Sequence, residues 1–70
     1  MNSAERLVHM ANQIATNLAT DHDPVAAVAE HVILFWDPRM KKIILEQGSA
    51  GLSPVAAAAI DRLRETQNAG

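Results

Sequence analysis

Three histidines supply the chain's imidazole groups, which in proteins serve as metal ligands and as acid–base catalysts. His9, His22 and His31 are spread along the sequence, without the His-x-x-x-His or Glu-x-x-His spacing that would place two ligands on one helical face. Glu30 directly precedes His31, but adjacent helical residues diverge by about 100° and do not form an acid–base pair. The sequence therefore predicts neither a metal site nor a paired acid and base.

The sequence contains no motif for a serine or cysteine nucleophile. The chain has no Cys, which excludes disulfides, thiolate metal sites and a cysteine nucleophile. Ser3, Ser49 and Ser53 fall at expected helix caps or in a loop, without the G-x-S-x-G elbow of a hydrolase. The run from Gly48 to Gly51 lacks the Gly-Lys-Ser/Thr ending and the preceding strand of a phosphate-binding loop. We therefore expect no catalytic, cofactor-binding or metal-binding residue in this chain.

A short basic cluster is formed by Arg39, Lys41 and Lys42. It is either a solvated helix face or a salt-bridging patch that meets a partner. The formal net charge of −2 argues against nucleic acid, whose protein partners usually carry a basic stripe. A helix-turn-helix DNA reader would also need more basic side chains on its recognition helix than this cluster supplies.

Apolar spacing and proline positions predict four helices and no strand. The helices are expected at residues 3–20, 24–36, 38–47 and 54–66. Asp23, Asp37 and Ser53 each precede a proline, and a capping side chain followed by proline is typical of a helix start. We therefore predict an all-α fold, a single small domain made of a bundle of four short helices.

The joint between the second and third predicted helices organises the chain. It follows the longest run of large apolar residues, which ends in the single Phe and the single Trp. Pro38 disfavours helical backbone at Asp37, while the Asp37 carboxylate can cap the helix that Pro38 begins. A one-residue joint of this kind predicts a sharp elbow and a steep helix crossing.

The end of the second helix is apolar on nearly every side. Val28, Val32 and Trp36 continue one stripe, whereas Ile33 and Leu34 point away from it. Four short helices cannot easily surround such a segment, and a 70-residue chain buries only about 60% of the surface that its unfolded form exposes. The predicted partner interface combines this segment with polar residues of the first helix: Ile33, Leu34, Phe35, Trp36, Arg39, Met40, Asn12 and Gln13. For the polar face of the first helix, an ordinary solvent face is the favoured interpretation, and contact with a partner is the alternative.

Three segments together resemble the delta subunit of NAD-dependent formate dehydrogenase. They are residues 7–15 (LVHMANQIA), residues 31–40 (HVILFWDPRM) and residues 51–55 (GLSPV), followed by an alanine-rich helix. The resemblance runs over nearly the whole chain in the family's order. It implies a small accessory subunit of a cytoplasmic enzyme that oxidises formate to CO2 and reduces NAD+ to NADH.

The resemblance also implies where the redox chemistry lies. The larger subunits would hold molybdopterin with molybdenum or tungsten, iron–sulfur clusters and FMN, and this chain would hold none of them. The chain has neither Cys for a cluster nor a dinucleotide-binding motif, which agrees with that division. Its expected partners are the large catalytic subunit and the electron-transfer subunits, with no nucleic acid and no membrane.

Three roles follow as hypotheses. The leading one is a noncatalytic subunit that docks on the large catalytic subunit and stabilises the complex. The alternative is a maturation factor that assists insertion of the molybdopterin cofactor into the apo enzyme. A third is a free-standing helical module that associates with copies of itself.

Overall fold

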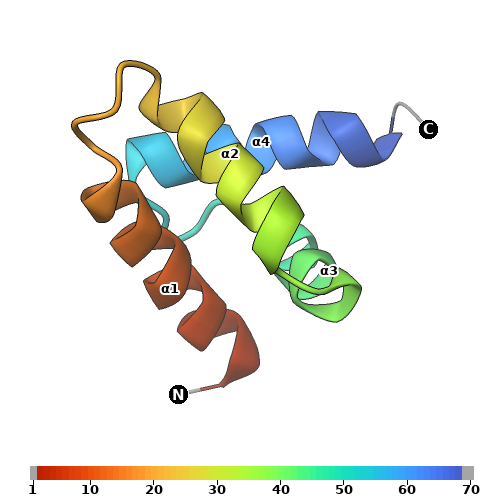
Figure 1. Cartoon of the computed structure of the whole chain (residues 1–70). Helices are drawn as coiled ribbons and strands as arrows, with labels where there is room; N and C mark the ends of the chain where they lie inside the picture. The colour runs from red at the N-terminus through yellow and green to blue at the C-terminus, as the bar shows by residue number, and fades with distance from the viewer. Residues whose placement is uncertain (1, 69–70) are drawn as a thin grey trace.

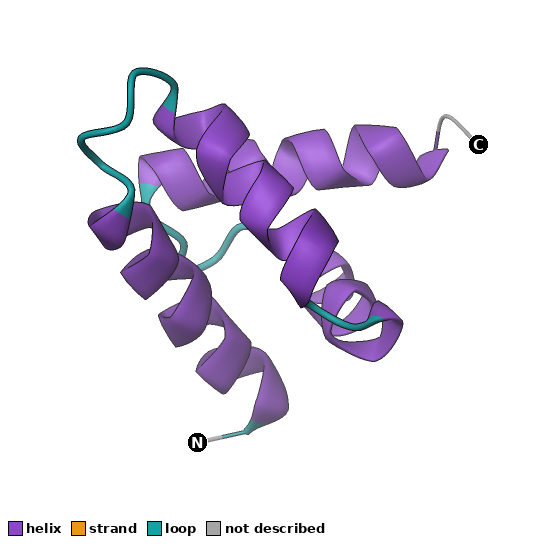
Figure 2. Ribbon diagram, in the orientation of Figure 1, coloured by secondary structure: helices purple, strands orange, loops and turns teal. Residues whose placement is uncertain are grey.

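The computed structural model describes residues 2–68, and this part of the chain consists of four α-helices joined by turns, without a strand. The helices are α1 (Ser3–Asn17), α2 (Pro24–Phe35), α3 (Pro38–Gln47) and α4 (Pro54–Asn68), shown in Figure 1 and by element type in Figure 2. The predicted all-α class is therefore confirmed.

Side-chain caps fix the helix starts. The carboxylate of Asp23 accepts a hydrogen bond from the backbone N–H of Ala26 at 3.2 Å, which starts α2. Asp37 accepts one from Met40 at 2.8 Å and starts α3. The Ser53 hydroxyl accepts a longer one from Ala56, at 3.4 Å, before α4. Each cap satisfies an N–H that has no partner inside its own helix.

The helix ends differ from the expected bounds by a few residues. α1 ends at Asn17, three residues before the expected end, because the chain tightens into successive turns. One of these turns is closed by a hydrogen bond from the Ala19 N–H to the Thr16 carbonyl at 3.3 Å. α4 continues to Asn68, two residues beyond its expected end.

The joint between α2 and α3 contains two residues, Trp36 and Asp37, rather than the single residue expected. Both have extended backbone, and Pro38 follows as the first residue of α3. The chain changes direction here, as Figure 1 shows by the different courses of α2 and α3. The steepness of that crossing stays a prediction.

The four helices pack against one another around one core. α2 lies across α4, as Figure 1 shows, and α1 contacts α3 as well as α2 and α4. The molecule measures 32 × 29 × 19 Å, so its short dimension holds no more than two layers of helices about 10 Å thick. The buried core residues, five of them alanines, are Leu7, Ala11, Ala15, Val28, Ala29, Val32, Trp36, Ile44, Ala56, Ala59, Ile60 and Leu63.

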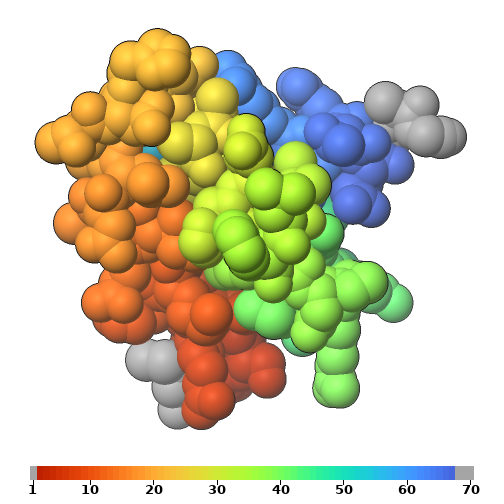
Figure 3. Space-filling view, viewed as in Figure 1, coloured from red at the N-terminus to blue at the C-terminus, as the bar shows by residue number. Residues whose placement is uncertain are grey.

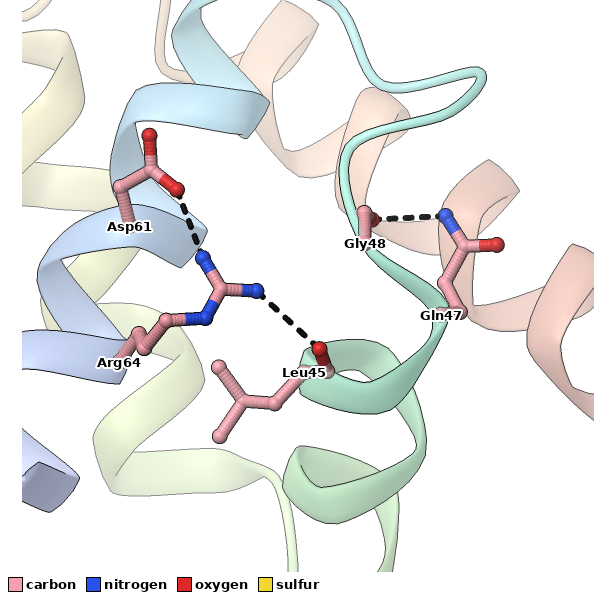
Figure 4. A network of polar contacts seen from close by, with 5 residues as sticks. All are labelled: Leu45, Gln47, Gly48, Asp61 and Arg64. Atoms are coloured by element: carbon pink, nitrogen blue, oxygen red, sulfur yellow. Dashed lines mark hydrogen bonds and ion pairs between the residues drawn. The ribbon is translucent and has the colours of Figure 1, made fainter.

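Polar side chains tie α3 to α4 and close the loop between them (Figure 4). Arg64 of α4 donates to the Asp61 carboxylate at 2.8 Å and to the Leu45 carbonyl at 3.1 Å. Leu45 lies in the last turn of α3, where carbonyls have no partner within the helix. The Gln47 amide donates to the Gly48 carbonyl at 2.8 Å and to the Ala50 carbonyl at 2.9 Å. Arg64 thus caps α3 from a neighbouring helix.

Within residues 2–68, no helix has the length and apolarity needed to cross a bilayer.

Candidate functional site

Three consecutive residues at the end of α2 expose their apolar side chains. We call Ile33, Leu34 and Phe35 the outer turn; their exposed fractions are 38%, 66% and 72%. Within the described part of the chain, they are the large hydrophobic residues that remain exposed. Scattered exposed apolar residues are ordinary, but a contiguous group in a small protein marks an interaction surface.

The neighbouring Trp36 has the opposite environment. Its exposed fraction is 5%, and it joins Val28 and Val32 in the core. Trp36 lies four residues after Val32, about one helical turn on, so it returns to the same inward face. Trp36 belongs to the predicted partner interface, but its indole lies in the protein's own core. It therefore offers little surface to a partner.

Two interactions hold the outer turn in place. The ring of His31 lies against the ring of Phe35, with centroids 4.8 Å apart and planes tilted by 43°. From α3, the Lys41 ammonium donates to the Ile33 carbonyl at 2.8 Å. That carbonyl belongs to the last turn of α2, where a positive charge also complements the helix dipole. Lys41, one of the basic cluster, is thus used within the chain, whereas Arg39 and Lys42 are exposed.

A groove of about 450 Å³ runs beside the outer turn. It lies between the turn that follows α1 and the outward side of α2. In Figure 3 these two segments are coloured orange and yellow to yellow-green. Its lining residues are Leu18, Asp21, His22, Asp23, Ala26, Ala27, Glu30, His31, Leu34 and Phe35. Sequence reasoning missed this groove, because it depends on how α1 and α2 are placed in space.

Arg39 and Met40, the α3 members of the predicted interface, lie elsewhere. They line a smaller groove of about 290 Å³ between α1 and α3, together with Arg6 and Met10. This groove and the one beside the outer turn share no lining residue. The predicted contact residues therefore belong to separate surfaces rather than to one.

Asn12 and Gln13, the polar candidates on α1, have different roles. The Asn12 amide donates to the Gly51 carbonyl at 2.9 Å, and its oxygen accepts from the Ser53 N–H at 2.8 Å. Both polar ends of the side chain thus bind the loop between α3 and α4. We call this pair of hydrogen bonds the Asn12 clamp. Gln13 is exposed beside it.

The clamp brings the loop close to α1. Gly51 has a φ of +81°, and a Cβ added at this position would lie 3.3 Å from the Val8 side chain. The positive φ favours glycine, and the short approach leaves little room for a larger residue. The composition of the loop suggests a turn, but nothing local in the sequence indicates that Asn12 is its partner.

The side chains that usually ligate metal centres are scarce in this chain. The chain has no Cys, and thiolates are the usual ligands of iron–sulfur clusters. Across residues 2–68, no three side chains of His, Asp or Glu are grouped so that they could hold a metal ion. His22 is 3.5 Å from the Asp21 carboxylate, but it is an exposed pair in the turn before α2.

Comparison with known proteins identifies the family. A family model described as the NADH-dependent formate dehydrogenase delta subunit FdsD matches residues 6–60. The chain belongs to the FdsD family. No curated protein and no solved structure matches it. The resemblance stated from the sequence is therefore confirmed, and the family is that of a subunit of a formate dehydrogenase.

The segment matched to the FdsD family contains the main features described above. It includes the outer turn, the groove beside it and the Asn12 clamp, and it ends at Ile60 within α4. A subunit functions in contact with other chains. The exposed apolar outer turn is accordingly the candidate functional surface of this FdsD-family chain.

Proposed function

We propose that this chain is a noncatalytic accessory subunit of a cytoplasmic NAD-dependent formate dehydrogenase, and that it docks on the large catalytic subunit and stabilises it. The observation that carries the proposal is the outer turn, in which Leu34 and Phe35 are 66% and 72% exposed. Membership of the FdsD family supports a role in that enzyme complex.

Energetics favour docking through this surface. Burial of an exposed Leu or Phe side chain contributes about 1.5–3 kcal/mol. His31 and Lys41 already hold the outer turn, so little conformational freedom is lost on binding. Because a chain with a thin, two-layer core has little stability of its own, binding to a partner would add to its stability.

The redox chemistry is assigned to the partners. We propose that molybdopterin with molybdenum or tungsten, the iron–sulfur clusters and FMN belong to the larger subunits. The absence of Cys from the sequence supports this division. The chain would contribute by holding the catalytic subunit in its folded, cofactor-loaded form.

The test is reconstitution of the complex with Leu34→Asp. A carboxylate in the centre of an apolar interface is desolvated without a partner, so binding should be lost. Leu34 is exposed, so the helical content of the free chain by circular dichroism should be unchanged. Co-purification of Leu34→Asp with the large subunit at the wild-type yield would contradict the proposal.

The maturation hypothesis differs in one measurable respect. A stabilising subunit is present in the purified active enzyme in stoichiometric amount. A factor that acts only during molybdopterin insertion is absent from the mature enzyme, and its loss lowers cofactor content. Quantification of the chain in active enzyme separates the two roles.

A further inference from the structure

We propose that the groove beside the outer turn receives a basic amphipathic helix of the large catalytic subunit. This inference rests on the proposed function and names the chemistry of the segment that docks. It is carried by three features of the groove: the rows of side chains along α2, the apolar residues among them, and the sign of the charges around them.

The side chains of α2 that line the groove form two parallel rows. Each row has the spacing of four residues that makes a ridge on a helix surface. The rows are Ala26, Glu30, Leu34 and Ala27, His31, Phe35. Two such ridges enclose a furrow into which a ridge of another helix fits, which is the commonest way that helices pack.

The size of the furrow suits a short helix. α2 has 12 residues and is therefore about 18 Å long, the length of roughly three helical turns. The two alanines, Ala26 and Ala27, allow close approach at one end, while Leu34 and Phe35 supply apolar contact at the other. Leu18 of the turn after α1 adds a partly buried apolar wall.

Carboxylates outnumber cationic groups around the furrow, where His22 and His31 are the basic side chains among the lining residues. Asp21, Asp23 and Glu30 line the groove, and no Lys or Arg lines it. The sequence explains this, since no Lys or Arg occurs between Arg6 and Arg39. A partner with Lys or Arg beside its apolar stripe would complement these carboxylates, and complementary charge also speeds association.

A second copy of the chain is a poor occupant of this groove. A symmetric dimer brings the same patch of both copies together. It would place each set of three carboxylates against an identical set, with no Lys or Arg in either groove to offset the repulsion. The groove therefore favours a partner of different composition.

Glu30 is the residue to vary, because it is exposed and lies midway along one row. Asp23 caps α2, and Asp21 accepts a hydrogen bond from the Asp23 N–H, so changes there would disturb the fold. Lys and Gln have helix propensities close to that of Glu. Glu65→Lys on α4 is the matched control, since Glu65 is exposed and lies outside the groove.

The experiment measures the affinity of the full chain for the large catalytic subunit at several salt concentrations. We expect Glu30→Lys to weaken binding about tenfold at low salt, and Glu30→Gln by about threefold. The differences should shrink as salt rises, because exposed charges are screened. Glu65→Lys should bind within about twofold of the wild type, as distant surface charges usually do.

The outcomes separate this inference from the proposed function. If Leu34→Asp abolishes docking but Glu30→Lys changes nothing, the surface is correct and the basic helix is wrong. If neither variant affects binding, the outer turn is not the docking surface and both proposals fail. If Leu34→Asp converts a dimer of the free chain into a monomer, the occupant is a second copy and the inference is overturned.

Discussion

The outer turn and the Asn12 clamp are two regions that sequence reasoning assigned to the same interface, yet the fold uses them in opposite ways. Ile33, Leu34 and Phe35 are apolar and remain exposed at the end of α2. Asn12 is polar, but both ends of its side chain bind the loop before α4. Residue type alone therefore does not separate contact with a partner from contact within the chain.

The difference lies in what each region meets inside the molecule. Asn12 finds two backbone groups of one loop, a carbonyl and an N–H, at hydrogen-bond distance. The apolar side chains of the outer turn stay exposed, because α2 turns Val28, Val32 and Trp36 into the core instead.

The largest difference in stability is expected between variants of two adjacent aromatic residues, Phe35 and Trp36. Trp36→Ala should lower the free energy of unfolding by about 3–5 kcal/mol, because it leaves a cavity in the core. Phe35→Ala should change it by less than about 0.5 kcal/mol, since Phe35 is 72% exposed. Thermal and urea unfolding of the full chain would measure both. Equal losses would mean that Phe35 is also part of the core.

The clamp should contribute next. Asn12→Ala leaves the Ser53 N–H without its partner and should cost about 2 kcal/mol of stability. Gln13→Ala, on the exposed side of the same helix, is the matched control and should lie within about 0.5 kcal/mol of the wild type. Amide hydrogen exchange at Leu52 and Ser53 should accelerate in Asn12→Ala alone. Unchanged exchange would show that the clamp does not hold the loop.

The outer turn should matter for binding rather than for folding. Phe35→Ala should weaken binding to the large catalytic subunit about tenfold, from lost apolar burial and a lost aromatic anchor. Isothermal titration calorimetry of the variant and of the wild type with the large catalytic subunit would measure this difference in affinity. Gln13→Ala again serves as the control, and an effect on binding as large as that of Phe35→Ala would move the interface towards α1.

The smallest contrast concerns the two glycines of the loop. Both have a φ of +81°, so alanine at either position should cost about 1 kcal/mol. Gly51→Ala should cost more than Gly48→Ala, because its new Cβ would crowd the Val8 side chain at 3.3 Å, whereas Gly48 has open space. Unfolding experiments on both variants test this, and an equal cost would mean that Val8 yields freely.

Local features of the fold could be predicted from the sequence. Asp23 with Pro24 and Asp37 with Pro38 start helices where the sequence indicates, because capping needs only residues three positions apart. The helical period also separated Leu34 from the inward stripe. The end of α1 was harder to predict, because no residue at Asn17 stops a helix. Helix and turn conformations differ little in free energy there, and helix ends are commonly uncertain by one or two residues.

Non-local features could not be predicted. The Asn12 clamp joins Asn12 to Gly51, which is 39 positions away in the sequence, and to Ser53, which is 41 positions away. Arg64 reaches the end of α3 from α4 across 19 positions. The groove beside the outer turn needs the end of α1 to lie next to α2. No local pattern encodes these distances, because they depend on the packing of all four helices.

The most direct measurement of the central claim is site-specific photo-crosslinking in the assembled complex. A photoreactive phenylalanine analogue would replace Leu34 in one variant and Glu65, an exposed residue of α4, in another. The account predicts a crosslink to the large catalytic subunit from position 34 and none from position 65. A crosslink from position 65 without one from position 34 would contradict docking through the outer turn.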